Sequence, residues 1–256
     1  MARLAVQLYT LRDRLQQDFQ GTLRDVANIG FEGVEFAGYG SLSPEGVRDC
    51  VKELGLVPVA SHVPFHRLQD ELDAVIREAQ IIGIGTVVCP FIPESLRASE
   101  DQYRELAQFF NRVGQACRAA GLTFAYHNHD FEFQLWSGHT ALDLLYECTD
   151  PELVQFELDV YWVEFARQHA ARCIAQYASR CRLLHVKDMS GDEERFFEAV
   201  GRGILPWPLI LGEADRAGVE WYIVEQDVCR RDPLESVRLS YEYLTGLSHP
   251  GVGNEA

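Results

Sequence analysis

Residues that could carry out chemistry are concentrated in one stretch near the middle of the chain. Residues 126–133 read Tyr-His-Asn-His-Asp-Phe-Glu-Phe and follow a short apolar segment, 122–125. Two histidines at positions i and i+2 point to the same face of an extended strand. A hydrogen-bonded structural pair would show the same spacing, so a functional role for His127 and His129 depends on what accompanies them.

Acidic, histidine and lysine side chains recur at the ends of the other predicted strands. In chain order the set is Glu35, His62, His127, His129, Glu157, Asp159, His185, Lys187, Asp188 and Glu225. Unpaired charges inside a barrel cost several kcal/mol each. A divalent metal ion bound by His127, Asp159, His185 and Glu225 explains why such groups converge. Mixed histidine and carboxylate ligands suit Mn²⁺, Zn²⁺, Co²⁺ or Fe²⁺ better than Ca²⁺.

Each of these residues also has a structural interpretation. We expect Glu157 to lie behind the ligands rather than to be one. Asp159 could cap the following helix, Lys187 could neutralise buried acids, and His62 could be a hydrogen-bonded wall residue. Glu225 has the least structural explanation, because it ends the apolar run Trp-Tyr-Ile-Val.

The elements that must position these side chains repeat one pattern: a helical run, a glycine and a short β-branched strand. Glycine just past a helix is the usual stop, because it adopts the left-handed conformation cheaply. The predicted strands are 4–9, 31–36, 56–60, 86–89, 122–125, 153–159, 182–188 and 221–225. This alternation predicts an α/β fold, a single (β/α)8 barrel over residues 1–247, with 248–256 as a flexible C-terminal tail. A doubly wound open sheet would usually show a glycine-rich turn after its first strand, and residues 9–13 have none.

Composition excludes several classes of protein. The net charge of −16 opposes binding to nucleic acid. No apolar run approaches the ~18 residues of a membrane span, and the N-terminus lacks a signal-peptide pattern, so we expect a cytoplasmic protein without membrane contact. The seven cysteines form no Cys-x-x-Cys pair, which argues against a cysteine zinc site and a disulfide framework. The oligomeric state stays open, with a homo-oligomer as one alternative.

The sequence resembles the xylose-isomerase-like TIM barrels of the sugar phosphate isomerase/epimerase group over nearly its whole length. The resemblance rests on Gly-Phe-Glu-Gly-Val-Glu at 30–35, Tyr-His-Asn-His at 126–129, Leu-Asp-Val-Tyr-Trp at 158–162, His-Val-Lys-Asp-Met at 185–189 and Val-Glu at 224–225. It implies one divalent metal ion, most often Mn²⁺, a keto-sugar or polyol substrate, and a proton-transferring glutamate on the last strand, here Glu225. Isomerases and epimerases of the group carry a glutamate on strand five, where this chain has His127. The Tyr-His-Asn-His form is closer to the inosose dehydratase branch and to barrels that act on 3-keto glycosides.

The expected reaction begins with removal of a proton beside a substrate carbonyl, which gives an enediolate. Glu225 or His129 would take the proton, and Lys187 would stabilise the oxyanion. Reprotonation isomerises or epimerises a keto-sugar or sugar phosphate, whereas loss of a neighbouring group makes the protein a dehydratase or a 3-keto-glycoside lyase. The residues expected to bind the sugar are Glu35, His62, Trp162, Asp188 and Arg202. Of these, Arg202 would bind a phosphate or carboxylate group.

Two other functions share this fold. An apurinic-endonuclease-like nuclease needs a cluster of several zinc ions and a surface that binds DNA. The net charge of −16 opposes DNA binding. A non-catalytic sugar-binding barrel would be expected to lose metal ligands, whereas all four positions here keep ligating residue types.

Overall fold

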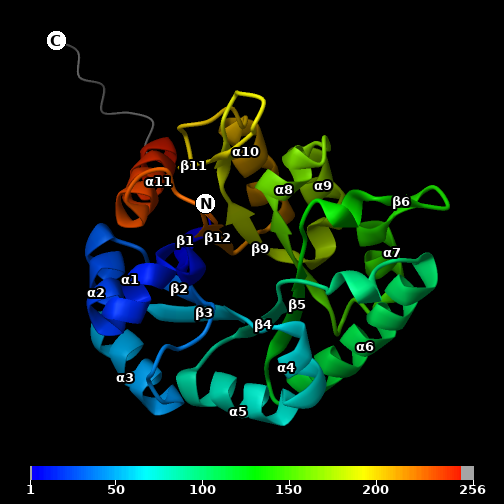
Figure 1. Ribbon diagram of the computed structural model, residues 1–256, viewed down its shortest axis with the longest axis horizontal. Coiled ribbons are helices and arrows are strands. Elements are labelled where there is room, and N and C mark those ends of the chain that lie inside the picture. The colour runs from blue at the N-terminus through cyan, green and yellow to red at the C-terminus, as the bar shows by residue number, and fades with distance from the viewer. Residues whose placement is uncertain (1, 249–256) are drawn as a thin grey trace.

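Eight parallel strands pair into a closed barrel in the computed structural model, which describes residues 2–248 (Figure 1). Around the barrel they follow the order β1 (Arg3–Gln7), β12 (Trp221–Val224), β9 (Cys181–Val186), β8 (Gln155–Asp159), β5 (Thr123–His127), β4 (Thr86–Cys89), β3 (Val57–His62) and β2 (Gly33–Phe36). The predicted (β/α)8 barrel is confirmed. The first strand ends at Gln7 rather than at Tyr9, because the Gln7 side chain accepts a hydrogen bond from the Tyr9 amide and starts a 3-10 turn, η1 (Leu8–Leu11).

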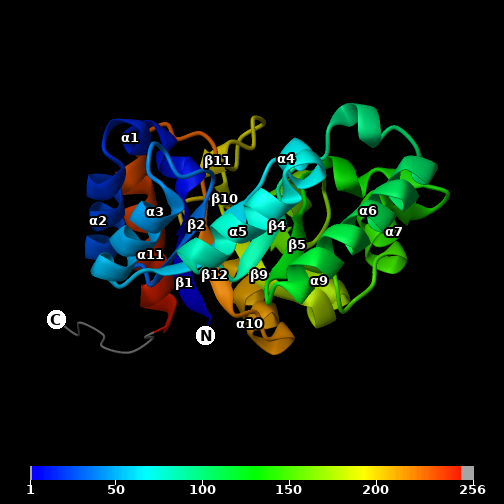
Figure 2. The same cartoon turned by 90° about the horizontal axis from the view of Figure 1, so that it is seen from below.

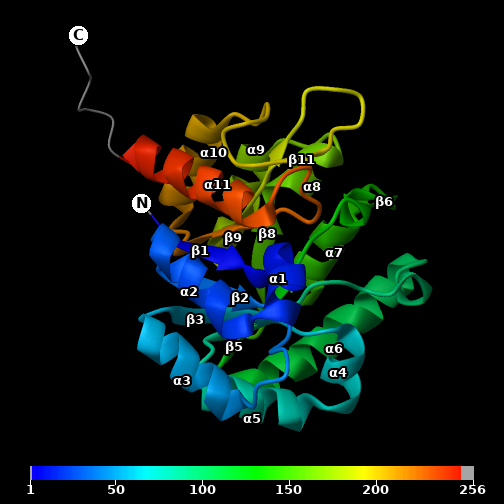
Figure 3. The same ribbon diagram turned by 60° about the vertical axis from the view of Figure 1, so that its left-hand side comes forward.

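Helices surround the barrel on its outer face. They are α1 (Arg12–Gln17), α2 (Phe19–Ile29), α3 (Pro44–Leu54), α4 (Phe65–Asp70), α5 (Leu72–Ile82), α6 (Glu100–Ala119), α7 (Ala141–Cys148), α8 (Val160–Phe165), α9 (Ala170–Tyr177), α10 (Trp207–Ala217) and α11 (Pro233–Ser248). The predicted glycine stops are confirmed after α2, α3, α5 and α10, where Gly30, Gly55, Gly83 and Gly218 have left-handed conformations. Helix α11 lies beside α2 and completes the ring (Figure 3). The predicted tail, apart from Ser248 at the end of α11, lies outside the described residues.

Two short hairpins lie at the end of the barrel where the strands finish. The hairpin of β10 (Asp188–Met189) and β11 (Phe197–Glu198) projects there, on the side opposite the N-terminus (Figure 2). A second hairpin, β6 (Leu135–Trp136) with β7 (His139–Thr140), follows the turn η3 (Phe131–Phe133). Two further 3-10 turns lie elsewhere in the chain: η2 (Glu94–Leu96) follows β4, and η4 (Ala178–Arg180) directly precedes β9. Among the described residues, no helix is long and apolar enough to cross a membrane.

The strands divide their side chains between two cores, and this division points the chemistry inward. On β5, Phe124 and Tyr126 belong to the core between barrel and helices, whereas Ala125 belongs to a smaller apolar cluster inside the barrel. His127, two residues after Ala125, therefore continues the inner face. The same alternation puts Leu183 and then His185 on the inner face of β9. The barrel interior is thus apolar in its lower part and polar at its upper end.

Register shifts in two strands accompany buried carboxylates. The pairing of β2 with β3 shifts between Val34 and Glu35, and that of β8 with β9 shifts between Phe156 and Glu157. A bulge changes the direction of the side chain at which it occurs. Both glutamates are fully buried. These irregularities bring Glu35 and Glu157 into the polar upper part of the barrel.

Glu132 in η3 holds the loop that follows β5. Its carboxylate accepts hydrogen bonds from the Tyr126 hydroxyl and, at 2.8 Å, from the amide of His129. Burial raises the pKa of Glu132 to about 7, against the opposing effect of these hydrogen bonds. The loop conformation that carries His129 therefore depends on a carboxyl group kept away from water.

We predict that Glu132→Gln removes a pH-dependent part of the stability. The folded-state pKa of Glu132 is above its ordinary value of 4.5, so the folded protein binds the proton more tightly than the unfolded chain does. This contribution is fully present below pH 4.5 and is lost as the pH rises through about 7. Relative to Glu132→Gln, the wild type should lose about 3 kcal/mol of unfolding free energy across this window. Urea unfolding at several pH values measures it, with the exposed Glu152→Gln as control. Parallel curves for wild type and Glu132→Gln would contradict the assignment.

Candidate active site

Four side chains from consecutive barrel strands meet at the upper end of the barrel. His127 ends β5, Asp159 ends β8, His185 lies one residue before the end of β9, and Glu225 directly follows β12. All four are buried, and one ligand atom from each lies within 4.8 Å of the others. This is the set expected to bind a metal ion.

Both histidines turn one ring nitrogen toward this set and the other toward a buried carboxylate. His127 Nδ1 is 3.0 Å from Glu157 Oε1, and its Nε2 is 3.7 Å from Asp159 Oδ2. His185 Nε2 is 2.6 Å from Glu35 Oε2, and its Nδ1 is 2.9 Å from Glu225 Oε2. A carboxylate behind a histidine fixes the tautomer and leaves the opposite nitrogen free to bind metal. This arrangement is the one expected if His127 and His185 bind the metal ion.

The same two histidines also form a second possible group, with His62 and Glu157. In that group one oxygen, Glu157 Oε1, lies within 3.0 Å of nitrogens of all three imidazole rings. Shared hydrogen bonds to that oxygen account for the geometry without an ion. The set with Asp159 and Glu225 supplies two carboxylates from separate strands and therefore fits a divalent cation better.

Negative charge exceeds positive charge in the centre of the site. The buried carboxylates are Glu35, Glu157, Asp159 and Glu225. Burial, together with the charge of Glu157, raises the pKa of Glu35 to about 7, and burial raises that of Asp159 to about 6. Asp159 Oδ2 is buried 2.9 Å from Lys187 Nζ and 3.7 Å from His127 Nε2. An excess of buried carboxylates beside imidazole nitrogens is what a divalent cation requires, so the residues present fit such an ion.

Lys187 is surrounded by three carboxylates. Its Nζ lies 2.9 Å from Asp159 Oδ2, 2.7 Å from Glu225 Oε2 and 2.8 Å from Asp227 Oδ2. Burial opposes the charged form, but these carboxylates raise the pKa of Lys187 well above its ordinary value. A lysine ammonium has three N–H donors, and all three face carboxylates here. Lys187 therefore balances charge and orients Asp159 and Glu225, two of the expected ligands, and its three donors are already directed at carboxylates.

His129 lies beyond the end of β5, and its ring is packed among aromatic side chains. It stacks on Phe131 with ring centroids 5.6 Å apart and lies 5.3 Å from the ring of Trp162. Its Nδ1 is buried and has no hydrogen-bond partner within the described residues 2–248. Burial and the neighbouring His127 and Lys187 lower the pKa of His129 well below its ordinary value, so the ring is neutral.

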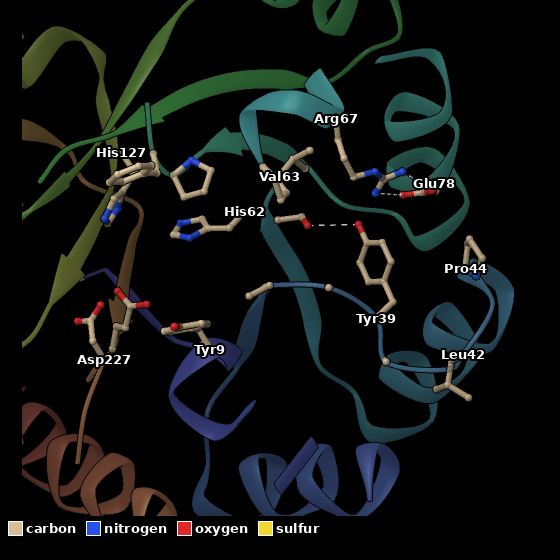
Figure 4. Close-up of a pocket in the computed structure, with 18 of the residues that line it drawn as sticks. Tyr9, Tyr39, Leu42, Pro44, His62, Val63, Arg67, Glu78, His127 and Asp227 are labelled. Carbon is tan, nitrogen blue, oxygen red and sulfur yellow. Dashed lines mark hydrogen bonds and ion pairs between the residues drawn. The ribbon is translucent and has the colours of Figure 1, made fainter. Parts of the chain in front are cut away.

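A cavity of about 680 Å³ opens onto these groups (Figure 4). His62, His127, His129, Glu225 and Asp227 line one end of it. This volume lies within the range of roughly 300–1,000 Å³ typical of small-molecule sites. His62 is a partly exposed residue of the cavity wall. Its ring stacks on that of His185, with ring centroids 5.3 Å apart.

The other expected substrate ligands do not line this cavity. Glu35 is fully buried and binds Gln7 and His185 through one oxygen. Asp188 accepts hydrogen bonds from four backbone amides and from the indole of Trp207, so it holds the loop before α10. Arg202 lies exposed on that loop. Trp162 contacts the ring of His129, which lines the cavity, but is not itself among the described lining residues.

Asp227 and Asn128 were not anticipated. Asp227 lines the cavity and binds Lys187, and its position two residues after Glu225 repeats the spacing of His127 and His129. Asn128 Oδ1 accepts a hydrogen bond from the amide of Asp159 at 3.0 Å, which joins the ends of β5 and β8. The spacing gives a signal for Asp227, whereas none in the sequence identifies the partner of Asn128.

Comparisons with known proteins identify relatives of this chain. Inosose dehydratase of Mesomycoplasma hyopneumoniae (strain 7448) is 26% identical over 183 residues, and this match spans 62% of the chain but only 59% of that protein. Inosose dehydratase of Geobacillus kaustophilus is 24% identical, with 93% of this chain and 90% of that protein covered. A solved sugar phosphate isomerase/epimerase from Parabacteroides distasonis superposes with a TM-score of 0.82 at 26% identity, covering 95% of this chain and 93% of that one.

A family model described as the xylose isomerase-like TIM barrel matches residues 23–246. An L-ribulose 3-epimerase shares the fold, with a TM-score of 0.74 at 15% identity over 96% of this chain and 94% of that one. The match to the family model extends over most of the barrel, from α2 into α11, and includes every residue of the four-ligand set. The chain therefore belongs to the xylose isomerase-like TIM barrel family.

Proposed function

We propose that the protein is a divalent-metal-dependent isomerase or epimerase that removes a proton beside the carbonyl of a keto-sugar and forms an enediolate. One observation carries the proposal: a neutral imidazole with an unpartnered nitrogen, His129, lines the same cavity as His127 and Glu225 of the ligand set. A base and a carbonyl-binding site in one cavity are what enolisation needs.

His127, Asp159, His185 and Glu225 would hold the metal ion, for which Mn²⁺ is our choice and Zn²⁺, Co²⁺ or Fe²⁺ are alternatives. When bound, such an ion supplies Lewis acidity that polarises the substrate carbonyl and acidifies the neighbouring C–H bond. Glu157 and Glu35 keep the two histidines in the tautomers that coordination requires.

Of the two candidate bases, His129 suits proton abstraction better than Glu225. Although burial opposes it, Lys187 and His185 lower the pKa of Glu225 well below its ordinary value. A carboxylate held by Lys187 and His185 suits the role of a ligand. The pKa of His129 is lowered as well, so the choice between the two bases rests on their contacts: among the described residues the His129 ring has no carboxylate partner, and it would take the proton and return it to the adjacent carbon.

Dehydration of an inosose, or elimination from a 3-keto glycoside, is the second candidate. Both reactions would start from the same enediolate. Loss of a neighbouring hydroxyl group dehydrates the substrate, and loss of a neighbouring glycosyl group cleaves the glycoside. This second candidate is favoured by His127 in place of a strand-five glutamate, and by inosose dehydratases that are similar over as much as 93% of the chain. A nuclease or a non-catalytic barrel has less support, because the net charge is −16 and all four ligand positions are filled.

Solvent exchange tests the proposal directly. The metal-loaded protein is incubated in deuterated water with keto-sugars, inososes and 3-keto glycosides. Deuterium should enter an epimerised product at the carbon that lost its proton and an isomerised product at the former carbonyl carbon, whereas dehydration or elimination is recognised by its unsaturated product. An isomerised or epimerised product without deuterium would contradict the enediolate.

Substitution of His129 should affect the chemical step and leave metal binding intact. We expect His129→Asn to lower kcat by about 10²- to 10⁴-fold, the usual contribution of a positioned acid or base. Metal content per chain should be unchanged, because His129 is not among the four ligands. His139→Asn, at a half-exposed histidine on β7, is the matched control and should behave as wild type. Wild-type turnover by His129→Asn would return the base to Glu225.

Substitution of Glu157 should act through the metal ion. Glu157→Gln weakens the support of His127 Nδ1, and we expect metal affinity to fall by roughly 10- to 100-fold. Titration with Mn²⁺ measures the affinity, and excess metal should restore most of the activity. Glu152→Gln, at an exposed site, is the control. Unchanged affinity would show that Glu157 does not orient a ligand.

A further inference from the structure

The cavity extends well beyond the metal-binding end. From His62 and His127 it continues past Val63 toward the loop between β2 and α3, where Tyr39 and Leu42 lie (Figure 4). The ligand set and His129 occupy only one end of its volume of about 680 Å³. Cavities of this size accommodate molecules larger than one sugar ring. We call the far part, lined by Tyr39, Leu42, Pro44, Val63, Arg67 and Glu78, the outer arm.

The walls of the outer arm are apolar and aromatic. Leu42, Pro44 and Val63 supply aliphatic surface, and Tyr39 supplies a ring whose hydroxyl lies 3.2 Å from Ser61 Oγ. The hydroxyl partner fixes the ring and leaves an aromatic surface for a ligand. A pyranose ring has an apolar C–H face and a hydroxyl rim, so such walls suit its face.

The far end of the arm is polar and holds donors and acceptors side by side. Arg67 binds Glu78 through two hydrogen bonds, at 3.1 and 2.9 Å, and Glu71 through a third. A guanidinium has five N–H donors, so two are left over, and each oxygen of Glu78 keeps an acceptor position. Neighbouring sugar hydroxyls both donate and accept, and they match this pair.

The charges along the cavity oppose a phosphate group. Among the described lining residues, Arg67 is the only lysine or arginine, and Glu78 and Glu71 already neutralise it. The lining also carries Glu225 and Asp227. Arg202, expected to bind phosphate, lies outside the cavity. A dianion would therefore meet more carboxylate than guanidinium.

We propose that the substrate is a non-phosphorylated glycoside of two rings, with its keto-sugar ring at the metal-binding end and a second sugar ring in the outer arm. This rests on the proposed function for the position of the keto group. The second-ring site is supported by the apolar and aromatic walls of the outer arm, by the Arg67–Glu78 pair and by the excess of carboxylates along the cavity.

Matched substrates and a blocked arm test the proposal. Leu42→Trp fills the arm, and Leu135→Trp, at a side chain 66% exposed on β6, is the control. Wild type should turn over a 3-keto disaccharide with a kcat/KM about tenfold or more above that of the 3-keto monosaccharide. Leu42→Trp should remove this preference and change the monosaccharide value by less than about twofold, whereas Leu135→Trp should keep it. Equal kcat/KM for the two sugars in wild type, or an equal loss for both in Leu42→Trp, overturns the second-ring site.

Binding without reaction separates this inference from the proposed function. Calorimetry on the metal-loaded protein compares the unoxidised disaccharide, the monosaccharide and its 6-phosphate. The disaccharide should bind about tenfold tighter than the monosaccharide in wild type and lose this advantage in Leu42→Trp. Tighter binding of the 6-phosphate than of the disaccharide overturns the inference. If no keto-sugar exchanges deuterium, the proposed function fails, and the calorimetric comparison still decides the outer arm.

Discussion

Four carboxylates facing one another inside a barrel are the constraint on which the rest of the site depends. Glu35, Glu157, Asp159 and Glu225 are buried where charge is poorly screened. Lys187 and the His185 ring, whose pKa these carboxylates raise against the effect of burial, offset only part of the negative charge. Imidazole N–H groups reduce the imbalance, and each donates toward a carboxylate. That requirement sets the ring orientations of the histidines, and the ring orientations leave nitrogens directed at Asp159 and Glu225. The proposed divalent cation would thus offset unfavourable buried charge.

The barrel geometry decides which residues meet this constraint. Successive side chains on a strand alternate between the helices and the interior, so apolar residues in the lower part and polar residues in the upper part share the inner face. Ala125 followed by His127, and Leu183 followed by His185, illustrate the sequence of layers. Because every barrel strand runs in the same direction, polar residues placed last on several strands must meet at one end. The four-ligand set, which extends along the sequence from His127 to Glu225, is collected there.

The same geometry explains what could be predicted from the sequence. The barrel follows from the repeated glycine stops, and the four-ligand cluster follows from strand ends that share a direction and a face. Asp188 was misplaced although alternation argues against an inward position: it follows Lys187 by one residue and so turns away, into the amides of the loop before α10. Glu35 does point inward, but no pattern shows that a histidine 150 positions away takes its carboxylate. Contacts between distant strands are set by packing, and local sequence carries no record of them.

The surroundings of the site differ on its two sides, and this difference orients any ligand. On the side of β8 and β9, Tyr161 stacks on Phe197 of β11 with ring centroids 4.4 Å apart, and Arg195 binds the carbonyls of Glu164 and Phe165. These contacts tie the hairpin to α8. The cavity instead extends toward β2 and β3. A ligand with its carbonyl near the four-ligand set must therefore direct its remaining atoms that way. Contacts to those atoms would lie far from the reacting carbon, and such remote contacts can hold a carbonyl in line with a base.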